Sequence, residues 1–425
     1  MVAEKQAGDC KRRRIGVLGA GRGLSLAYGA RANGFDIAAV CDQDPVFARR
    51  AARKLGGDCL ILSTFDQLLD SGVEAVVLAN YAVEHAPFAV RALDAGVHVI
   101  SECMACFTLA EGVALAEAAE RSRAVYMMAE NYPFIVQNLL MKRLFDEGRV
   151  GQFVYGEGEY VHPISAYEMA RLYTGPDHWR AWNSPIYYCT HSMGPVMNIT
   201  GTRPVSVNGF AFPHNKHDLE LAKSIRVNDS GGLLVCRMDN EAVVKLLPCS
   251  ALRDHGQRYR ICGDRGALEW NQGDGRVRIH HEPYDVPPGT ALHEWREASF
   301  PAEFSEALRH GHGGGDYFTM HYFRKALETG TIEPRLGVYD SLAMTVVGIQ
   351  GYRSALAGGA TMEIPDFRDK EARAKYRDDH WAHGPLAKGP DRAPCSVRGT
   401  LAASPEALAF FKEARAEWER RWEEP

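Results

Sequence analysis

The sequence lacks any apolar run that approaches the roughly 20 residues a membrane-spanning helix needs. It also lacks an excess of positive charge, because 49 Lys and Arg stand against 54 Asp and Glu and leave a formal net charge of −5. A mildly acidic chain is a poor candidate for binding nucleic acid through its overall field. The composition therefore predicts a protein that binds neither nucleic acid nor membranes.

An apolar leader and a regular spacing of cysteines are missing as well. The polar start runs to Arg14, and no segment of signal-peptide type follows it. The 10 cysteines follow no repeating spacing, so we expect reduced, mostly buried thiols. Cys103 and Cys106 form an isolated Cys-x-x-Cys, which is a poor zinc site because a second pair is missing; we interpret it as chance spacing, the alternative being a redox-sensitive pair. We predict a cytoplasmic protein without a metal site.

What the chain does have is the composition of a soluble globular protein, with 46% apolar and 24% charged residues, and a length of 425 residues that predicts two or three domains. Up to about residue 130, short β-rich runs alternate with helix-period segments, which predicts a parallel sheet with helices on both faces. These strands are predicted at Arg14–Leu18, Ile37–Cys41, Cys59–Leu62, Ala75–Ala79, His98–Ser101 and Ala124–Met128. Beyond about residue 150, consecutive strands with short turns predict a mostly antiparallel sheet, and helices are predicted at Tyr317–Glu328, Val338–Ala357 and Pro405–Glu423.

The first predicted strand runs into Gly19-Ala20-Gly21-Arg22-Gly23 and then into a helix. Glycines there let the backbone turn tightly and approach a pyrophosphate, while the helix N-terminus supplies free N–H groups. The dinucleotide fingerprint has its third glycine at the position of Leu24, whereas this chain has its third glycine one residue earlier, at Gly23. The second strand ends in Asp42, whose carboxylate can accept the ribose hydroxyls and repels a 2′-phosphate. We therefore predict a Rossmann domain that binds NAD rather than NADP, the alternative being a glycine-rich turn without a cofactor.

Four stretches of the chain resemble the Gfo/Idh/MocA oxidoreductases over roughly residues 12–365. They are the turn with Asp42, Val76-Val77-Leu78-Ala79-Asn80 leading to His85, Gly96-Val97-His98-Val99-Ile100-Ser101-Glu102, and Glu130-Asn131. The resemblance implies an α/β Rossmann domain over 1–130, an α+β substrate and oligomerisation domain with an open, mostly antiparallel sheet over 131–365, and a C-terminal extension over 366–425. It also implies that Asn80, His85, Glu102 and Asn131 lie near the nicotinamide half of NAD. A homo-oligomer, either a dimer or a tetramer, is expected.

One departure from the family separates dehydrogenase from glycosidase chemistry. The sugar dehydrogenases of this family carry Glu-Lys-Pro where this chain has Glu102-Cys103-Met104. That lysine helps to deprotonate the substrate hydroxyl, and a thiol cannot replace a cationic ammonium. A branch of the family that also lacks the lysine comprises the NAD-dependent glycosidases, notably the α-N-acetylgalactosaminidase-like enzymes.

Three further stretches are similar to that glycosidase branch. They are Tyr187-Tyr188-Cys189-Thr190-His191-Ser192-Met193-Gly194-Pro195, His312-Gly313-Gly314-Gly315-Asp316-Tyr317 and Glu157-Gly158-Glu159-Tyr160-Val161-His162. The resemblance places Glu130, Tyr160, Arg180, Tyr188 and His191 around the bound sugar. His312 and Asp316 either bind the substrate or cap the predicted helix that follows them. A related branch acts on sulfoquinovose glycosides, and its sulfonate could be bound by Arg180, His178, Lys216 and His217.

The resemblance implies hydrolysis without net redox change. NAD⁺ would oxidise C3 of the sugar, which acidifies the proton on C2; the C1 substituent would leave by elimination, water would add, and C3 would be reduced again. His191 is the natural base for the C3 hydroxyl, because its side-chain type has an unperturbed pKa of about 6.5. Tyr188 would need a lowered pKa to deprotonate C2, while Tyr160 or His162, on one face of a strand, could assist the leaving group.

We thus predict an NAD-dependent glycosidase that acts on a small-molecule glycoside. One alternative is a sugar or polyol dehydrogenase that releases NADH, which the missing lysine argues against. The other is a non-catalytic NAD-binding regulator, which would not need the tyrosine and histidine motifs. Trp179 and Trp182 are either core residues or a platform for the sugar.

Overall fold

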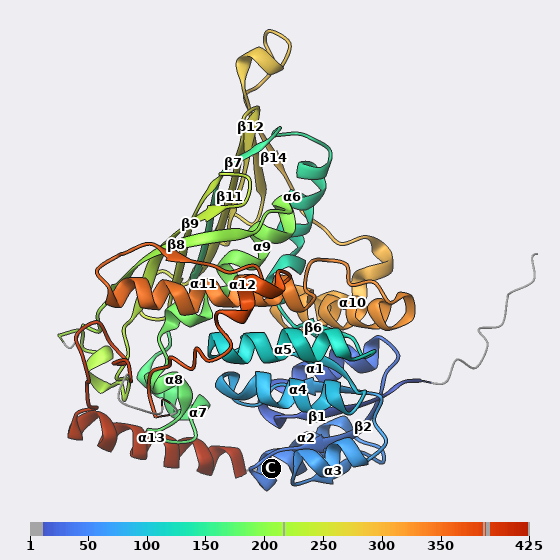
Figure 1. Ribbon diagram of the computed structural model, residues 1–425, viewed down its shortest axis with the longest axis vertical. Helices are drawn as coiled ribbons and strands as arrows, with labels where there is room; N and C mark the ends of the chain where they lie inside the picture. Colours follow the sequence, from blue (N-terminus) through green and yellow to red (C-terminus); the bar gives the residue numbers. More distant parts are fainter. Residues whose placement is uncertain (1–11, 216, 386, 388–391, 424–425) are drawn as a thin grey trace, which may run out of the picture.

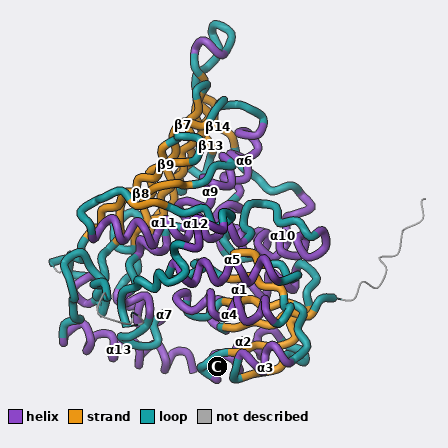
Figure 2. The backbone as a smooth tube through the Cα atoms, in the orientation of Figure 1, coloured by secondary structure: helices purple, strands orange, loops and turns teal. Residues whose placement is uncertain are grey.

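Two β-sheets organise the molecule, one toward each end of its long axis, with helices packed between and around them (Figure 1, Figure 2). The computed structural model describes residues 12–423 apart from 216, 386 and 388–391, so the polar start up to residue 11 and Lys216 lie outside the described residues. Among the helices of the described chain, none is long and apolar enough to cross a membrane.

The first sheet is the predicted Rossmann sheet. Its strands are β1 (Arg14–Leu18), β2 (Asp36–Cys41), β3 (Leu60–Leu62), β4 (Ala75–Leu78), β5 (His98–Ser101) and β6 (Tyr126–Met128), all parallel and in the order β3-β2-β1-β4-β5-β6. The helices between them are α1 (Ala20–Ala32), α2 (Pro45–Leu55), α3 (Phe65–Asp70), α4 (His85–Asp94) and α5 (Leu109–Arg121). The strand order reverses between β1 and β4, which is where such sheets bind nucleotides. The turn after β1 and the turn after β4 therefore flank the cofactor site.

The second sheet has nine strands in the order β14-β13-β12-β11-β7-β10-β9-β8-β15. They are β7 (Phe153–Val161), β8 (Pro204–Phe212), β9 (Gly231–Met238), β10 (Val243–Cys249), β11 (Gly256–Gly263), β12 (Gly266–Asn271), β13 (Val277–His281), β14 (His293–Arg296) and β15 (Met362–Glu363). Neighbouring strands are antiparallel except for β7 and β10, which run parallel. The prediction of an open, mostly antiparallel sheet is confirmed.

Six helices outside the Rossmann domain carry or surround the candidate site. They are α6 (Val136–Asp146), α7 (Ala166–Leu172), α8 (Trp179–Trp182), α9 (Thr190–Thr200), α10 (Gly315–Thr329) and α11 (Val338–Leu356). α10 packs on α1, while α11 lies between the second sheet and α5 (Figure 1). The C-terminal extension adds α12 (Lys370–Ala374) and α13 (Pro405–Glu423), and α13 packs against α7, where Arg415 donates to the carbonyls of Ala170 and Tyr173. The extension therefore supports the segment that leads into α8.

The close contact between α9 and β7 depends on the absence of a side chain at Gly158. A Cβ atom built there would lie 2.0 Å from the backbone oxygen of Ser192. Glycine lets the first turn of α9 lie directly on the strand, and this turn carries His191. The ring of His191 consequently lies 4.8 Å from that of Tyr160 on β7.

We expect Gly158→Ala to destabilise the protein by about 1–3 kcal/mol, the usual cost of overpacking, because the new methyl group must push α9 away from β7. The matched control is Gly256→Ala on the neighbouring strand β11, where the nearest atom to a built Cβ lies at 3.8 Å. Denaturant unfolding followed by circular dichroism measures both. Equal midpoints for the two variants would contradict the proposed contact.

Candidate functional site

The turn after β1 has the shape that a dinucleotide requires. Gly19 has φ 90°, and a Cβ built on it would lie 2.3 Å from the backbone oxygen of Ala79, so a residue with a side chain does not fit there. A Cβ built on Gly21 would meet nothing within 4 Å, so this side of the turn is open. The helix α1 begins directly after Gly19, and apart from the N–H of Ala20, which Asp42 accepts, the N–H groups at its N-terminus are available to a pyrophosphate.

Asp42 and two asparagines extend this site. The carboxylate of Asp42 accepts the backbone N–H groups of Ala20 at 2.7 Å and Asp44 at 2.8 Å, which fixes it beside the glycine-rich turn. The side-chain amide oxygens of Asn80 and Asn131 are buried and have no donor among the described residues. Buried polar atoms without a partner are rare in proteins, so these two fit groups that donate hydrogen bonds to a bound molecule. The residues therefore fit NAD.

His85 supports this region rather than facing it. Its side chain is buried, and its ring nitrogens lie 3.0 Å from the Met104 carbonyl oxygen and 3.3 Å from that of Asn80. Burial lowers its pKa, so the ring stays neutral and ties the turn after β4 to the segment after β5.

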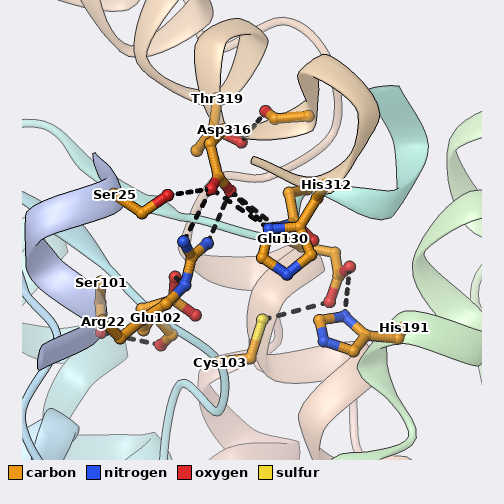
Figure 3. Close-up of polar contacts among 12 residues, drawn as sticks. Arg22, Ser25, Ser101, Glu102, Cys103, Glu130, His191, His312, Asp316 and Thr319 are labelled. Carbon is orange, nitrogen blue, oxygen red and sulfur yellow. Dashed lines mark hydrogen bonds and ion pairs between the residues drawn. The ribbon is translucent and has the colours of Figure 1, made fainter. Parts of the chain in front are cut away.

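A fully buried carboxylate, Asp316, joins the cofactor turn to the second domain (Figure 3). Arg22 donates to both of its oxygens, at 2.6 and 2.7 Å, and also pairs with Glu102 at 2.8 Å. Asp316 further accepts hydrogen bonds from Ser25 and Asn131, and it lies 3.1 Å from Nδ1 of His312. Burial alone would raise the pKa of Asp316, but His312 and Arg22 outweigh it and lower the pKa. No side-chain hydrogen bond caps α10, so the capping interpretation of His312 and Asp316 is wrong.

A second buried carboxylate, Glu130, lies between His191 and Cys103 (Figure 3). Its Oε1 atom is 2.7 Å from Nδ1 of His191 and also accepts the backbone N–H of Tyr132. Its Oε2 atom accepts the thiol of Cys103 at 3.1 Å. Burial would raise the pKa of Glu130, but the neighbouring His191 and the hydrogen bonds from His191 and Cys103 lower it. Glu130 is therefore ionised at neutral pH and holds the His191 ring in place.

Three tyrosine rings surround His191. Tyr132 stacks on it, with 4.2 Å between the ring centres. Tyr160 and Tyr188 contact it edge-on, with 4.8 and 4.7 Å between the ring centres. Burial raises the pKa of both Tyr160 and Tyr188. Their phenols are thus protonated at neutral pH, which makes them hydrogen-bond donors rather than bases.

The remaining predicted residues lie around this group. His162 follows β7 directly, and its ring lies 5.7 Å from that of Tyr160, which agrees with the expected shared face. Arg180 on α8 places its guanidinium 4.3 Å from the ring centre of Trp179. Both Trp179 and Trp182 are buried in the core, so neither is an open platform for a sugar.

Residues 13–130 match the family described as the oxidoreductase family with an NAD-binding Rossmann fold (GFO_IDH_MocA), and residues 243–375 match the C-terminal domain of glycosyl hydrolase 109. The two parts of the chain thus match an NAD-binding domain of the Gfo/Idh/MocA oxidoreductases and a C-terminal domain of glycosyl hydrolase 109. The cofactor of its first domain is NAD, as predicted from the glycine-rich turn and Asp42.

Curated relatives include proteins named for glycosyl hydrolase family 109. A glycosyl hydrolase family 109 protein of Saccharopolyspora erythraea is 26% identical over 86% of this chain and 85% of its own length. An α-N-acetylgalactosaminidase of Shewanella oneidensis is 22% identical over 83% of this chain and 84% of its own length. Among solved structures, levoglucosan dehydrogenase in complex with NADH and levoglucosan has a TM-score of 0.71 and 19% identity, covering 84% of this chain and 100% of that one. The last likeness is one of fold.

Sequence reasoning missed two contacts of this site. Tyr132 follows the Glu130-Asn131 motif directly, and its place in the motif was the available signal for the ring that stacks on His191. Cys103 was recognised as a departure from the family, but its hydrogen bond to Glu130 crosses 27 residues of sequence and left no local signal.

We expect Asp42→Ala to lower NAD affinity and to narrow the preference for NAD over NADP, because the carboxylate that repels a 2′-phosphate is gone. The control is Asp44→Ala, which removes only the cap of α2, where Asp44 accepts the N–H of Val46. Titration of the purified proteins with both nucleotides measures the preference. An unchanged preference in the Asp42 variant would contradict the assignment of the ribose contact.

Proposed function

We propose that the protein is an NAD-dependent glycosidase that cleaves a glycoside by oxidation at C3, elimination of the C1 substituent, addition of water and reduction at C3. The observation that carries this proposal is a histidine, His191, held by a buried carboxylate in a site that has Cys103 where the family's dehydrogenases have lysine. Bound NAD supplies reversible hydride transfer at a sugar carbon, so that neither product nor cofactor changes redox state overall.

His191 is assigned as the base for the C3 hydroxyl. Because ionised Glu130 can only accept hydrogen bonds, Nδ1 of His191 carries a proton, and in the neutral form of the ring Nε2 carries the free lone pair. A sugar hydroxyl at Nε2 can then lose its proton as C3 is oxidised. The phenols of Tyr160 and Tyr188, next to the imidazole, donate hydrogen bonds to sugar oxygens.

The elimination step removes a proton from C2 and delivers one to the leaving group, and His312 is the candidate base for the C2 proton that the geometry favours. Its Nδ1 atom lies 3.1 Å from Asp316, so this pair repeats the arrangement of His191 and Glu130. The side chain of His312 is 41% exposed, so a substrate can reach it. His162, whose buried Nδ1 atom has no partner among the described residues, is the candidate for protonating the leaving group.

The positive charge of Arg180 is relevant to which class of sugar the site binds. Its guanidinium has no carboxylate partner among the described residues, and it lies close enough to lower the pKa of Tyr160 and Tyr188 against the larger effect of burial. An unpaired cation beside the sugar site suits an anionic sugar such as a sulfoquinovose glycoside as well as a neutral one. Burial and Arg180 lower the pKa of His178 to about 3, so His178 adds no charge there.

We further propose a cytoplasmic homo-oligomer, dimer or tetramer, formed through the open face of the second sheet. Charged side chains on one face of adjacent strands support this idea. Lys245 on β10 contacts Glu157 and Glu159 on β7, and Arg258 and Arg260 on β11 contact the same glutamates from the other side. Such a polar, ordered face suits a wet interface between subunits.

The proposal is tested with nitrophenyl glycosides of neutral, N-acetylated and anionic sugars, with nitrophenol and NADH recorded together. We expect nitrophenol without net NADH. His191→Phe should reduce turnover by roughly 10²–10⁴-fold, the usual effect of a lost acid–base group, with NAD content unchanged. His280→Phe on β13 is the matched control. NADH formed from free sugar would instead identify a dehydrogenase, and neither signal with NAD still bound would identify a regulator.

A further inference from the structure

Cys103 occupies the position of the dehydrogenase lysine, and its thiol is a committed hydrogen-bond donor. The residue follows β5, is buried, and has its Sγ atom 3.1 Å from Oε2 of Glu130. Burial raises the pKa of the thiol well above its usual range, and Glu130 raises it further. The sulfur therefore keeps its proton at neutral pH and shares it with the carboxylate.

Glu130 needs this donor because its charge is buried. An ionised carboxylate removed from water is costly unless hydrogen bonds replace its hydration. Oε1 already accepts from His191 and from the backbone of Tyr132, Cys103 donates to Oε2, and the Thr190 side chain also lowers the pKa of the carboxyl. The thiol thus completes the set that keeps the carboxylate ionised and its orientation fixed.

We infer that Cys103 is a positioning residue for proton transfer, which replaces the missing lysine indirectly by fixing Glu130 and, through it, His191. The inference rests on the proposed function, in which His191 is the base at the C3 hydroxyl. A lysine would bring a fixed positive charge to the hydroxyl, whereas a neutral thiol leaves the proton to the imidazole. Position 103 then suits a reaction cycle in which the C3 hydroxyl loses its proton and later regains it.

Further titratable side chains face Glu130 and His191 from the surrounding elements. They are Glu102 beside Cys103, Cys189 before α9, Tyr132, Tyr160, His162, Tyr188 and Tyr259. Arg180 lies close enough to lower the pKa of Tyr160 and Tyr188, but no lysine or arginine of the described chain forms an ion pair with Glu130. Within the described chain, the donors on the Glu130 carboxylate therefore determine how readily it stays ionised.

The same three side chains offer a competing arrangement. One donor atom each from Cys103, Glu130 and His191 lies within 4.8 Å of the others, so a thiophilic divalent cation could draw them together. A metal-bound cysteine is a thiolate and has no S–H bond, whereas the hydrogen-bonded thiol keeps it. Direct contacts of Glu130 with both neighbours favour the hydrogen-bonded arrangement.

Infrared difference spectroscopy of the whole protein separates the two arrangements. Subtracting the spectrum of Cys103→Ala from that of the parent isolates the S–H stretching band of Cys103, and Cys106→Ala gives that of an equally buried thiol in the same loop. We expect the Cys103 band at lower frequency than the Cys106 band, and a shift toward the Cys106 frequency in Glu130→Gln. Equal frequencies in the parent, or no S–H band together with a stoichiometric bound metal, would overturn the inference.

Kinetics test the positioning role. Cys103→Ser retains a donor and should keep kcat within a few fold, whereas Cys103→Ala should lower kcat roughly tenfold, as expected for one hydrogen bond to a charged group. Removing the donor also raises the pKa of Glu130, so the acid limb of the kcat/KM profile should move to higher pH in the alanine variant alone. Cys106→Ala should match the parent. Equal losses of kcat in both Cys103 variants, with the acid limb of the kcat/KM profile unchanged, would contradict the positioning role. The infrared band can be measured without turnover, so it shows whether such a result speaks against the role of Cys103 or against the proposed function.

Discussion

The buried charge of Glu130 is the interaction on which the rest of the site depends. A carboxylate without exposed surface is tolerated only where donors surround it, and here they come from three separate parts of the chain: Cys103 after β5, Tyr132 after β6 and His191 on α9. Satisfying one charge therefore brings the end of the Rossmann sheet and the first turn of α9 to a single point. The position of the imidazole follows from that requirement.

Asp316 is a second buried carboxylate that is held by hydrogen-bond donors. One of them is Asn131, the residue that follows Glu130, which donates to Asp316 at 2.9 Å. Its other donors include Arg22 and Ser25 from the cofactor turn and the beginning of α1. The two carboxylates thus tie the NAD turn, the link between the domains and the two histidines into one hydrogen-bonded network. A rigid connection of this kind suits a cofactor that stays in place while the sugar is oxidised and reduced again.

The sequence predicted the Rossmann domain closely, since β1 and β5 have the predicted bounds, and α13 in the C-terminal extension does as well. Central parallel strands are uniformly apolar and helix caps carry local sequence signals, so both can be predicted from a single sequence. The helices α7, α8 and α9 were not predicted. α9 is buried on nearly every side and contains Gly194 and Pro195, so it shows neither an amphipathic period nor helix-forming composition. Residue types of the site could be predicted from motifs, but pairings such as Arg22 with Asp316, 294 residues apart, depend on tertiary folding.

The account makes one chemical commitment that direct displacement at C1 does not share: the proton on C2 of the sugar is removed and replaced during every turnover. Hydrolysis of a cleavable glycoside in heavy water, followed by NMR of the released sugar, measures this exchange directly. The account predicts one deuterium at C2 and full retention of deuterium placed beforehand at C3. Released sugar that carries only protium at C2 at full conversion would contradict it.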